Sequence, residues 1–207
     1  MGLIHIDLFS TLDGVGQAPG GPEEDPDDGF AFGGWQAPLI DDVAGEQVVA
    51  GMHGMDALLL GRRTYDIFAA YWPHEVGVIA DLFNSIPKYV ASRHAPNLEW
   101  AGSTLLGPDA ASAVRELRER HDNIHVIGSL DFVQTLLAER LFDRLTLWVY
   151  PILLGGGKRV FAGGVAPTNL RLVEPVIASP RGALLQRYEL ADGRPGVGTM
   201  AEVLTER

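Results

Sequence analysis

The 207-residue sequence contains no cysteine, and this absence excludes several kinds of chemistry at once. Disulfide bonds, thiolate nucleophiles, iron–sulfur clusters and cysteine-based zinc sites all require that residue. The six histidines show no metal-binding spacing either, so we expect no metal. A chain without disulfides fits a reducing compartment, and we therefore expect a cytoplasmic protein.

Basic residues are scarce, since 16 lysines and arginines stand against 27 aspartates and glutamates, for a formal net charge of −11. Such an acidic surface repels phosphate backbones, so we expect no nucleic-acid partner. No apolar run approaches the ~18 residues of a membrane-spanning helix, and the first residues do not resemble a signal peptide, so we expect no membrane contact. Basic residues that gather near glycines would instead indicate a small anionic ligand.

Short apolar runs alternate with amphipathic stretches, and this pattern predicts an α/β fold. Residues 3–8 and 145–149 alternate as half-buried strands do, whereas residues 57–60 form the continuous apolar run of a buried parallel strand. Further strands are expected at 88–92, 124–127 and 184–190, and helices at 41–52, 61–72, 109–120 and 130–141. Early strand–helix alternation followed by late strands favours a central mixed, mostly parallel sheet with helices on both faces. We expect one domain, 1–191, followed by a loosely ordered tail, 192–207.

A long segment rich in glycine, proline and acids, residues 15–38, separates the first expected strand from the first expected helix. Its acidic centre, residues 23–28, fits either a lid over a site or a tolerated surface insertion. Residues 30–35 place three aromatic side chains beside two glycines, and exposing them would be costly. We therefore expect this flank to pack near a pocket.

Three expected strands end in glycine or basic turns, at residues 61–64, 92–93 and 128–129. Ligands bind at the carboxyl ends of strands in open α/β sheets, where helix N-termini offer free N–H groups to phosphate. Glycine lets the backbone approach closely, and arginine matches phosphate oxygens. Each turn alone is also typical of an ordinary helix entry or strand end, and the chain has neither G-x-G-x-x-G nor a P-loop. Together the turns indicate a site for a diphosphate and one further phosphate.

The order of five motifs resembles the RibD C-terminal domain family, the reductase module of riboflavin biosynthesis, which is related in fold to dihydrofolate reductase. The motifs are Ser10–Gly14, Gly33–Trp35, Leu60–Tyr65, Val126–Ser129 and Pro151–Phe161. The resemblance runs from about Leu3 to Leu190. It implies a dihydrofolate-reductase-like three-layer fold, bound NADPH, and hydride transfer to a small heterocycle or ribosyl-type carbonyl such as 5-amino-6-(5-phosphoribosylamino)uracil.

The resemblance also implies which residues form the site. The implied cofactor-binding residues are Gly61, Arg62, Arg63, Thr64, Ser92, Arg93, Gly128, Ser129, Leu130, Gly155, Gly156 and Gly157. Leu130 departs from the small residue that many relatives carry after Gly-Ser. The candidate catalytic residues are Asp13 and Trp35, which match positions beside the nicotinamide or substrate, and Glu46, on the helix where dihydrofolate reductase carries a carboxylate. Asp13 also fits a simple turn, and Trp35 a core anchor.

Three functions stay open on the sequence. The chain fits a reductase of the riboflavin type, a stand-alone reductase of another pterin, flavin or related compound, or a non-catalytic NADPH-binding protein. We also expect a homodimer, because the late strands resemble the family's dimer-forming region. Trp148 and Tyr150 lie opposite the apolar face of residues 145–149 and would suit an interface, unless helices of the same chain cover them.

Overall fold

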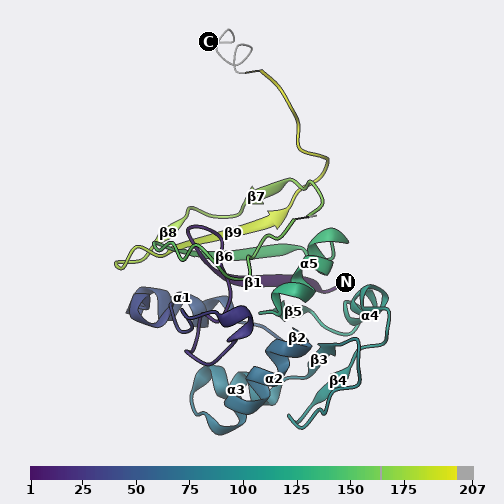
Figure 1. The fold of residues 1–207 in the computed structure, drawn as a ribbon. Helices are drawn as coiled ribbons and strands as arrows, with labels where there is room; N and C mark the ends of the chain where they lie inside the picture. The colour runs from purple at the N-terminus through teal and green to yellow at the C-terminus, as the bar shows by residue number, and fades with distance from the viewer. Residues whose placement is uncertain (164, 200–207) are drawn as a thin grey trace.

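The computed structural model describes residues 1–163 and 165–199, and it confirms the predicted α/β fold with a mostly parallel central sheet (Figure 1). The described part contains nine strands in that sheet. They are β1 (Leu3–Thr11), β2 (Ala57–Gly61), β3 (Lys88–Ala91), β4 (Ser103–Leu105), β5 (Asn123–Val126), β6 (Arg144–Tyr150), β7 (Leu170–Leu172), β8 (Ile177–Ala178) and β9 (Leu184–Leu190).

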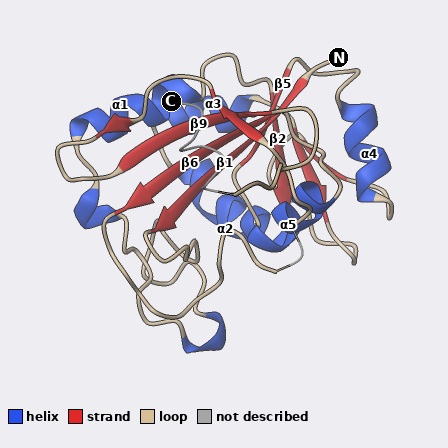
Figure 2. Cartoon of the chain, turned by 90° about the horizontal axis from the view of Figure 1, so that it is seen from above, coloured by secondary structure: helices blue, strands red, loops and turns tan. Residues whose placement is uncertain are grey.

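The strands follow the order β4-β3-β2-β5-β1-β6-β9-β7, with β8 also beside β9, and fan out as one twisted sheet (Figure 2). The six strands from β4 to β6 are parallel, and β9 runs antiparallel to β6. Consequently β3, β2 and β5 are neighbours and end at the same edge. The three turns expected to bind phosphate follow these very strands, so the fold brings them together.

Helices cover both faces of the sheet. They are α1 (Asp42–Gly51), α2 (Arg62–Tyr71), α3 (Val78–Ser85), α4 (Ala110–Leu117) and α5 (Leu130–Ala138), with short 3₁₀ turns η1 (Asp27–Gly29), η2 (Ala37–Leu39) and η3 (Trp72–His74). Strand β2 shows the two faces directly, because Leu59 packs with the core under α4 and α5 whereas Leu58 and Leu60 pack with α2 and α3. This arrangement gives three layers.

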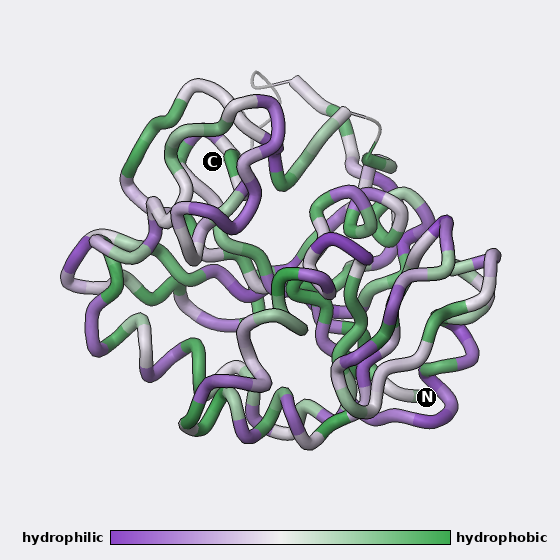
Figure 3. The backbone as a smooth tube through the Cα atoms, turned by 60° about the horizontal axis from the view of Figure 1, so that its bottom comes forward, coloured by the Kyte–Doolittle hydropathy of each residue, from purple (hydrophilic) through white to green (hydrophobic). Residues whose placement is uncertain are grey.

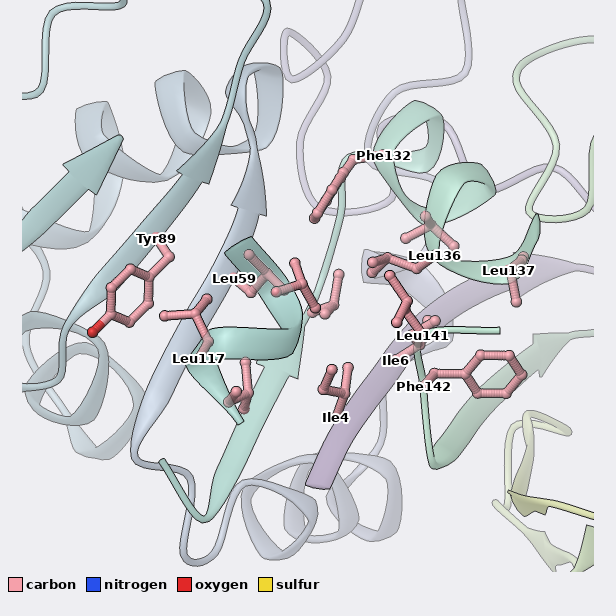
Figure 4. Packing of buried hydrophobic residues seen from close by; sticks show 14 of the residues in the cluster. Ile4, Ile6, Leu59, Tyr89, Leu117, Phe132, Leu136, Leu137, Leu141 and Phe142 are labelled. Atoms are coloured by element: carbon pink, nitrogen blue, oxygen red, sulfur yellow. The ribbon is translucent and has the colours of Figure 1, made fainter. Parts of the chain in front are cut away.

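The largest core lies between the sheet and helices α4 and α5. Ile4 and Ile6 of β1 are fully buried there against Leu136 of α5 and Leu117 of α4 (Figure 4). Short hydrophobic stretches (green) alternate with hydrophilic ones (purple) along the backbone (Figure 3). Burial of the apolar surface of this core drives the association of the layers.

The expectation that Trp148 and Tyr150 form a dimer interface is wrong. Both side chains are buried, at 4% and 0% exposure, beneath Trp35 and the apolar face of α1, which includes Ala44. The rings of Trp35 and Tyr150 pack edge to face at 5.5 Å. The chain's own helix therefore covers these aromatics, as the alternative reading of the sequence allowed.

After β9 the chain leaves the sheet, and residues 192–199 extend away without regular secondary structure (Figure 1). The rest of the expected tail, residues 200–207, lies outside the described residues. Within residues 1–163 and 165–199, every helix is too short or too polar to cross a bilayer.

Candidate cofactor and substrate site

The turns after β2, β3 and β5 open into one cavity of about 1880 Å³. Its lining includes every residue predicted at these turns: Gly61, Arg62, Arg63, Thr64, Ser92, Arg93, Gly128, Ser129 and Leu130. The structure thus brings together residues that lie up to 69 positions apart between Gly61 and Leu130. Its position at the carboxyl edge of parallel strands is where ligands bind in open α/β sheets.

The turns after β2 and β5 pack against each other so closely that both need glycine. The backbone N–H of Gly61 donates to the Gly128 carbonyl at 3.0 Å. A Cβ atom on Gly61 would lie 2.1 Å from Ser129 Oγ, and one on Gly128 would lie 2.6 Å from Thr64 Oγ1. Gly128 also has a φ of 146° and precedes a cis peptide bond. The space between the turns therefore has no room for a side chain at Gly61 or Gly128.

Helices α2 and α5 both begin at this cavity, and neither start carries a side-chain cap. Gly61 and Ser129 hold the capping positions, and neither side chain bonds the first helical turn. The first N–H groups of a helix lack internal partners, and the helix dipole adds positive charge there. These two starts, together with the glycine turns, form a cradle that fits an anionic group such as a diphosphate.

Arg62 and Arg93 at this edge have only weak internal partners. Arg62 pairs with Asp66 one turn along α2, with both side chains nearly half exposed. Arg93 lies 3.5 Å from Asp131, and both of these side chains are more than 80% exposed. Exposed ion pairs of this kind contribute little to stability, so a phosphate can replace the carboxylate partner of either guanidinium group.

Arg63 differs, because two carboxylates from the acidic loop already bind it. Its Nη1 donates to Asp25 Oδ1 at 2.6 Å and also to Asp27. The same carboxylates bind Lys158 Nζ, at 2.6 Å for Asp25 and 3.0 Å for Asp27. Hydrogen bonds from Lys158 and Arg63 lower the pKa of Asp27. The pKa of Arg63 is raised, since these carboxylates outweigh the opposing effect of burial.

We call residues 24–28 the acidic strap. Glu24, Asp25 and Asp27 line the cavity, so this segment forms part of the cavity wall and is not a detached surface insertion. The buried side chain of Gln17 holds it, because Gln17 Nε2 donates to the Asp25 carbonyl at 3.0 Å while its Oε1 accepts from the Lys158 N–H at 2.9 Å. No sequence pattern marks Gln17, which lies in a segment rich in glycine and proline.

Asp13 lies outside the cavity lining and supports a turn. Its carboxylate accepts from Thr11 Oγ1 at 2.5 Å and from the backbone N–H of Gly155 at 2.8 Å. These bonds, that from Thr11 foremost, lower its pKa. Gly155, Gly156 and Gly157 are also absent from the cavity lining. The structure thus joins Asp13 to the glycine turn without bringing either into contact with the cavity.

Trp35 and Glu46 do not line the cavity either. Trp35 is 7% exposed, and its Nε1 donates to the Gln17 carbonyl at 2.8 Å, so it anchors the loop to the core. Glu46 is exposed on α1. Asp41, the first acid near that helix, accepts from the Ala44 N–H at 2.9 Å as a helix cap. The structure therefore brings none of the three candidate catalytic residues into the cavity.

A second part of the cavity, which we call the apolar end, is lined by the two residues that flank η2 and by residues of α1, α2 and η3. Ile40 and Val49 are 37% and 40% exposed there, and Phe68 and Trp72 line the same cavity. One buried polar residue, Gln36, accompanies them, with its Nε2 donating to Tyr150 Oη at 2.7 Å. Burial raises the pKa of Tyr150. No sequence pattern marks Gln36, because its role depends on the contact with Tyr150, which lies 114 residues later in the chain.

The fold and the cavity at its strand ends define a protein of the dihydrofolate-reductase-like class. The RibD C-terminal domain family matches residues 3–179, and the chain belongs to this family. Family membership and fold point to a reductase of the riboflavin-biosynthesis type. The five-motif resemblance in the sequence is thereby confirmed.

Individual relatives are distant in sequence but similar in fold. The uncharacterized protein YyaP of Bacillus subtilis (strain 168) is 24% identical over 180 residues, which cover 82% of this chain and 86% of YyaP. A protein assigned to riboflavin biosynthesis from Shewanella sp. PV-4 is 18% identical, with a TM-score of 0.65, covering 92% of this chain and 99% of that one. Dihydrofolate reductase from Enterococcus faecalis, complexed with NADP(H), is 11% identical with a TM-score of 0.60, covering 92% and 97%.

Proposed function

We propose that the chain is an NADPH-dependent reductase that transfers hydride to a small heterocyclic or ribosyl-type carbonyl compound. One observation carries the proposal: the Gly61–Thr64 and Gly128–Leu130 turns form one cradle, with two uncapped helix starts, at the edge of a large cavity. Membership of a reductase family supports the activity. The similar fold of a dihydrofolate reductase complexed with NADP(H) supports the cofactor.

The residues of the cradle divide the work of holding the cofactor. Backbone N–H groups at the starts of α2 and α5 would bind the diphosphate, and Gly61 and Gly128 let the backbone approach it. Arg62 and Arg93 would bind the additional phosphate that distinguishes NADPH from NADH. When bound, NADPH supplies the hydride, and the walls of the cavity orient the ring and exclude water.

No carboxylate of α1 is placed to donate the proton that must accompany the hydride. Asp41 is used as a cap and Glu46 lies outside the cavity lining, while Asp25 and Asp27 are paired with cations. We propose that water in the cavity delivers the proton, and that Gln36 orients either this water or the substrate. No single carboxylate is then indispensable for turnover.

A panel assay tests the proposal. Purified protein is given NADPH and, in turn, oxidised pyrimidines, pterins and flavins, while the absorbance of reduced nicotinamide is followed. The proposal predicts steady oxidation with at least one heterocycle. Tight NADPH binding without turnover on the whole panel would instead support the alternative of a non-catalytic cofactor-binding protein.

A further inference from the structure

The acidic strap determines which charges a substrate meets in the cavity. Asp25 and Asp27 each bind both Arg63 and Lys158, so two carboxylates hold two cations that come from α2 and from the turn after β6. Asp25 is only 9% exposed, and the Gln17 side chain fixes the strap from beneath. The cluster is therefore a built part of the cavity wall and not a chance contact between surface side chains.

A phosphate group on the substrate would find poor partners in this wall. At Arg63 Nη1 or Lys158 Nζ it would compete with Asp25 and Asp27, and both carboxylates would stay beside it as like charges. Arg159, another basic residue of the lining, donates to the Asp13 carbonyl oxygen. Two further basic residues of the lining, Arg62 and Arg93, lie at the edge that the proposed cofactor occupies.

The apolar end favours a different kind of ligand. Ile40 and Val49 line the cavity and are each more than a third exposed, and Phe68 and Trp72 line it too. Covering such a concave apolar surface is favourable, and a flat ring covers it well. Gln36 lines the same cavity, where its backbone N–H donates to the Pro19 carbonyl at 3.2 Å and its side-chain Nε2 donates to Tyr150 Oη. Gln36 thereby places one amide group where a ring nitrogen or carbonyl can bond it.

From these two features we infer that the substrate is an uncharged planar ring compound without a phosphate group, and that Asp25 and Asp27 determine this specificity. The inference rests on the proposed reductase function and narrows its substrate class. The inferred substrate class excludes a phosphoribosyl compound, which is the substrate that the family resemblance implied. Removing the two negative charges should convert the Arg63–Lys158 pair into a phosphate site.

Ribose 5-phosphate is the probe for that conversion, and calorimetric titration into NADPH-saturated protein is the measurement. We expect the Asp25→Asn/Asp27→Asn variant to bind it at least about tenfold more tightly than the wild type does. The matched control is Glu23→Gln/Asp28→Asn, which removes the same charge from exposed positions of the same loop outside the ion cluster. No gain in the first variant, or an equal gain in the control, overturns the inference.

A second measurement needs only the wild-type protein, so it holds even if the variant does not fold. Riboflavin and its 5′-phosphate share one planar ring and differ by the phosphate, and flavin fluorescence reports their binding to protein saturated with NADP⁺, which cannot reduce them. We expect riboflavin to bind at least about tenfold more tightly. Tighter binding of the phosphate ester, equal binding, or binding of neither flavin overturns the inference. Saturation with NADP⁺ is measured beforehand, and failure of the cofactor to bind would count against the proposed function itself.

Discussion

The carboxylate of Asp13 accepts a hydrogen bond from the backbone N–H of Gly155 at 2.8 Å, which joins the turn after β1 to the turn after β6. The two residues are 142 positions apart, and both turns follow neighbouring strands of the sheet. Arg159 strengthens the connection through the Asp13 carbonyl oxygen. Asp13 is therefore best understood as a residue that positions the glycine turn and, through Lys158, the acidic strap.

We expect Asp13→Asn to weaken this connection without abolishing activity. The amide keeps one acceptor oxygen and loses the other, and the site is partly solvated, so unfolding free energy should fall by no more than about 1 kcal/mol. Chemical denaturation and kcat/KM with a working substrate measure the two effects, with the exposed Asp28→Asn as control. A thousandfold loss of kcat/KM at unchanged stability would show instead that Asp13 acts in the chemical step.

Gly128→Val should abolish cofactor binding while the chain still folds. The φ of 146° disfavours a branched residue, and its Cβ would press on Thr64 at the start of α2. Gly156→Val is the matched control, because nothing lies within 4 Å of its Cβ position and it does not line the cavity. Circular dichroism checks folding and fluorescence quenching checks binding. A folded Gly128→Val protein with normal NADPH affinity rules out our assignment of this turn.

Acid should destabilise the protein partly through His5. Its ring is 9% exposed, stacks on His125 at 4.4 Å, and burial lowers its pKa from 6.5 to about 4. Because the folded-state pKa is depressed, the stabilisation is present above pH 6.5 and is lost as the pH falls towards 4, by on the order of 3 kcal/mol. Denaturation at several pH values should show that the unfolding free energy of His5→Phe depends less on pH than that of the wild type. Parallel curves for the two proteins would contradict this role.

The homodimer stays a prediction, and the structure suggests another surface for it. Strand β7 lies at the sheet edge, where Leu172, Val173 and Val176 are each more than 40% exposed. Apolar side chains on an edge strand favour pairing with a second copy. We expect a dimer by light scattering at tens of micromolar, and a monomer for Val173→Lys. Val76→Lys, at another exposed site, is the control, and a monomeric wild type would refute the prediction.

The sequence predicted the parts of the fold that depend on local pattern. Strand β9 was placed at its observed bounds, and β2 was expected from a continuous apolar run. Helix α3 was missed although Ile79, Leu82 and Phe83 have helical spacing, because Gly77 opens it without a capping side chain. The short strands β4, β7 and β8 were also missed, since their existence depends on neighbours far along the chain.

The candidate site divides in the same way. The phosphate turns could be predicted because strand order alone brings the residues after β2, β3 and β5 to one edge. The role of Arg63 could not, because its partners Asp25 and Asp27 reach it only through the course of an irregular loop. The roles of Gln17 and Gln36 could not be predicted either, because they depend on long-range hydrogen bonds with Lys158 and Tyr150.

A preference for NADPH over NADH would show that the arginines at the cradle bind the additional phosphate. NADPH and NADH are titrated separately into the wild-type protein and the quenching of tryptophan fluorescence gives the two Kd values, with Arg93→Ala measured alongside. Because Arg62 and Arg93 have only exposed ion-pair partners, we expect NADPH to bind at least about tenfold more tightly than NADH, and Arg93→Ala to reduce this difference in affinity. Equal affinities for the two nucleotides, or binding of neither, would contradict this expectation.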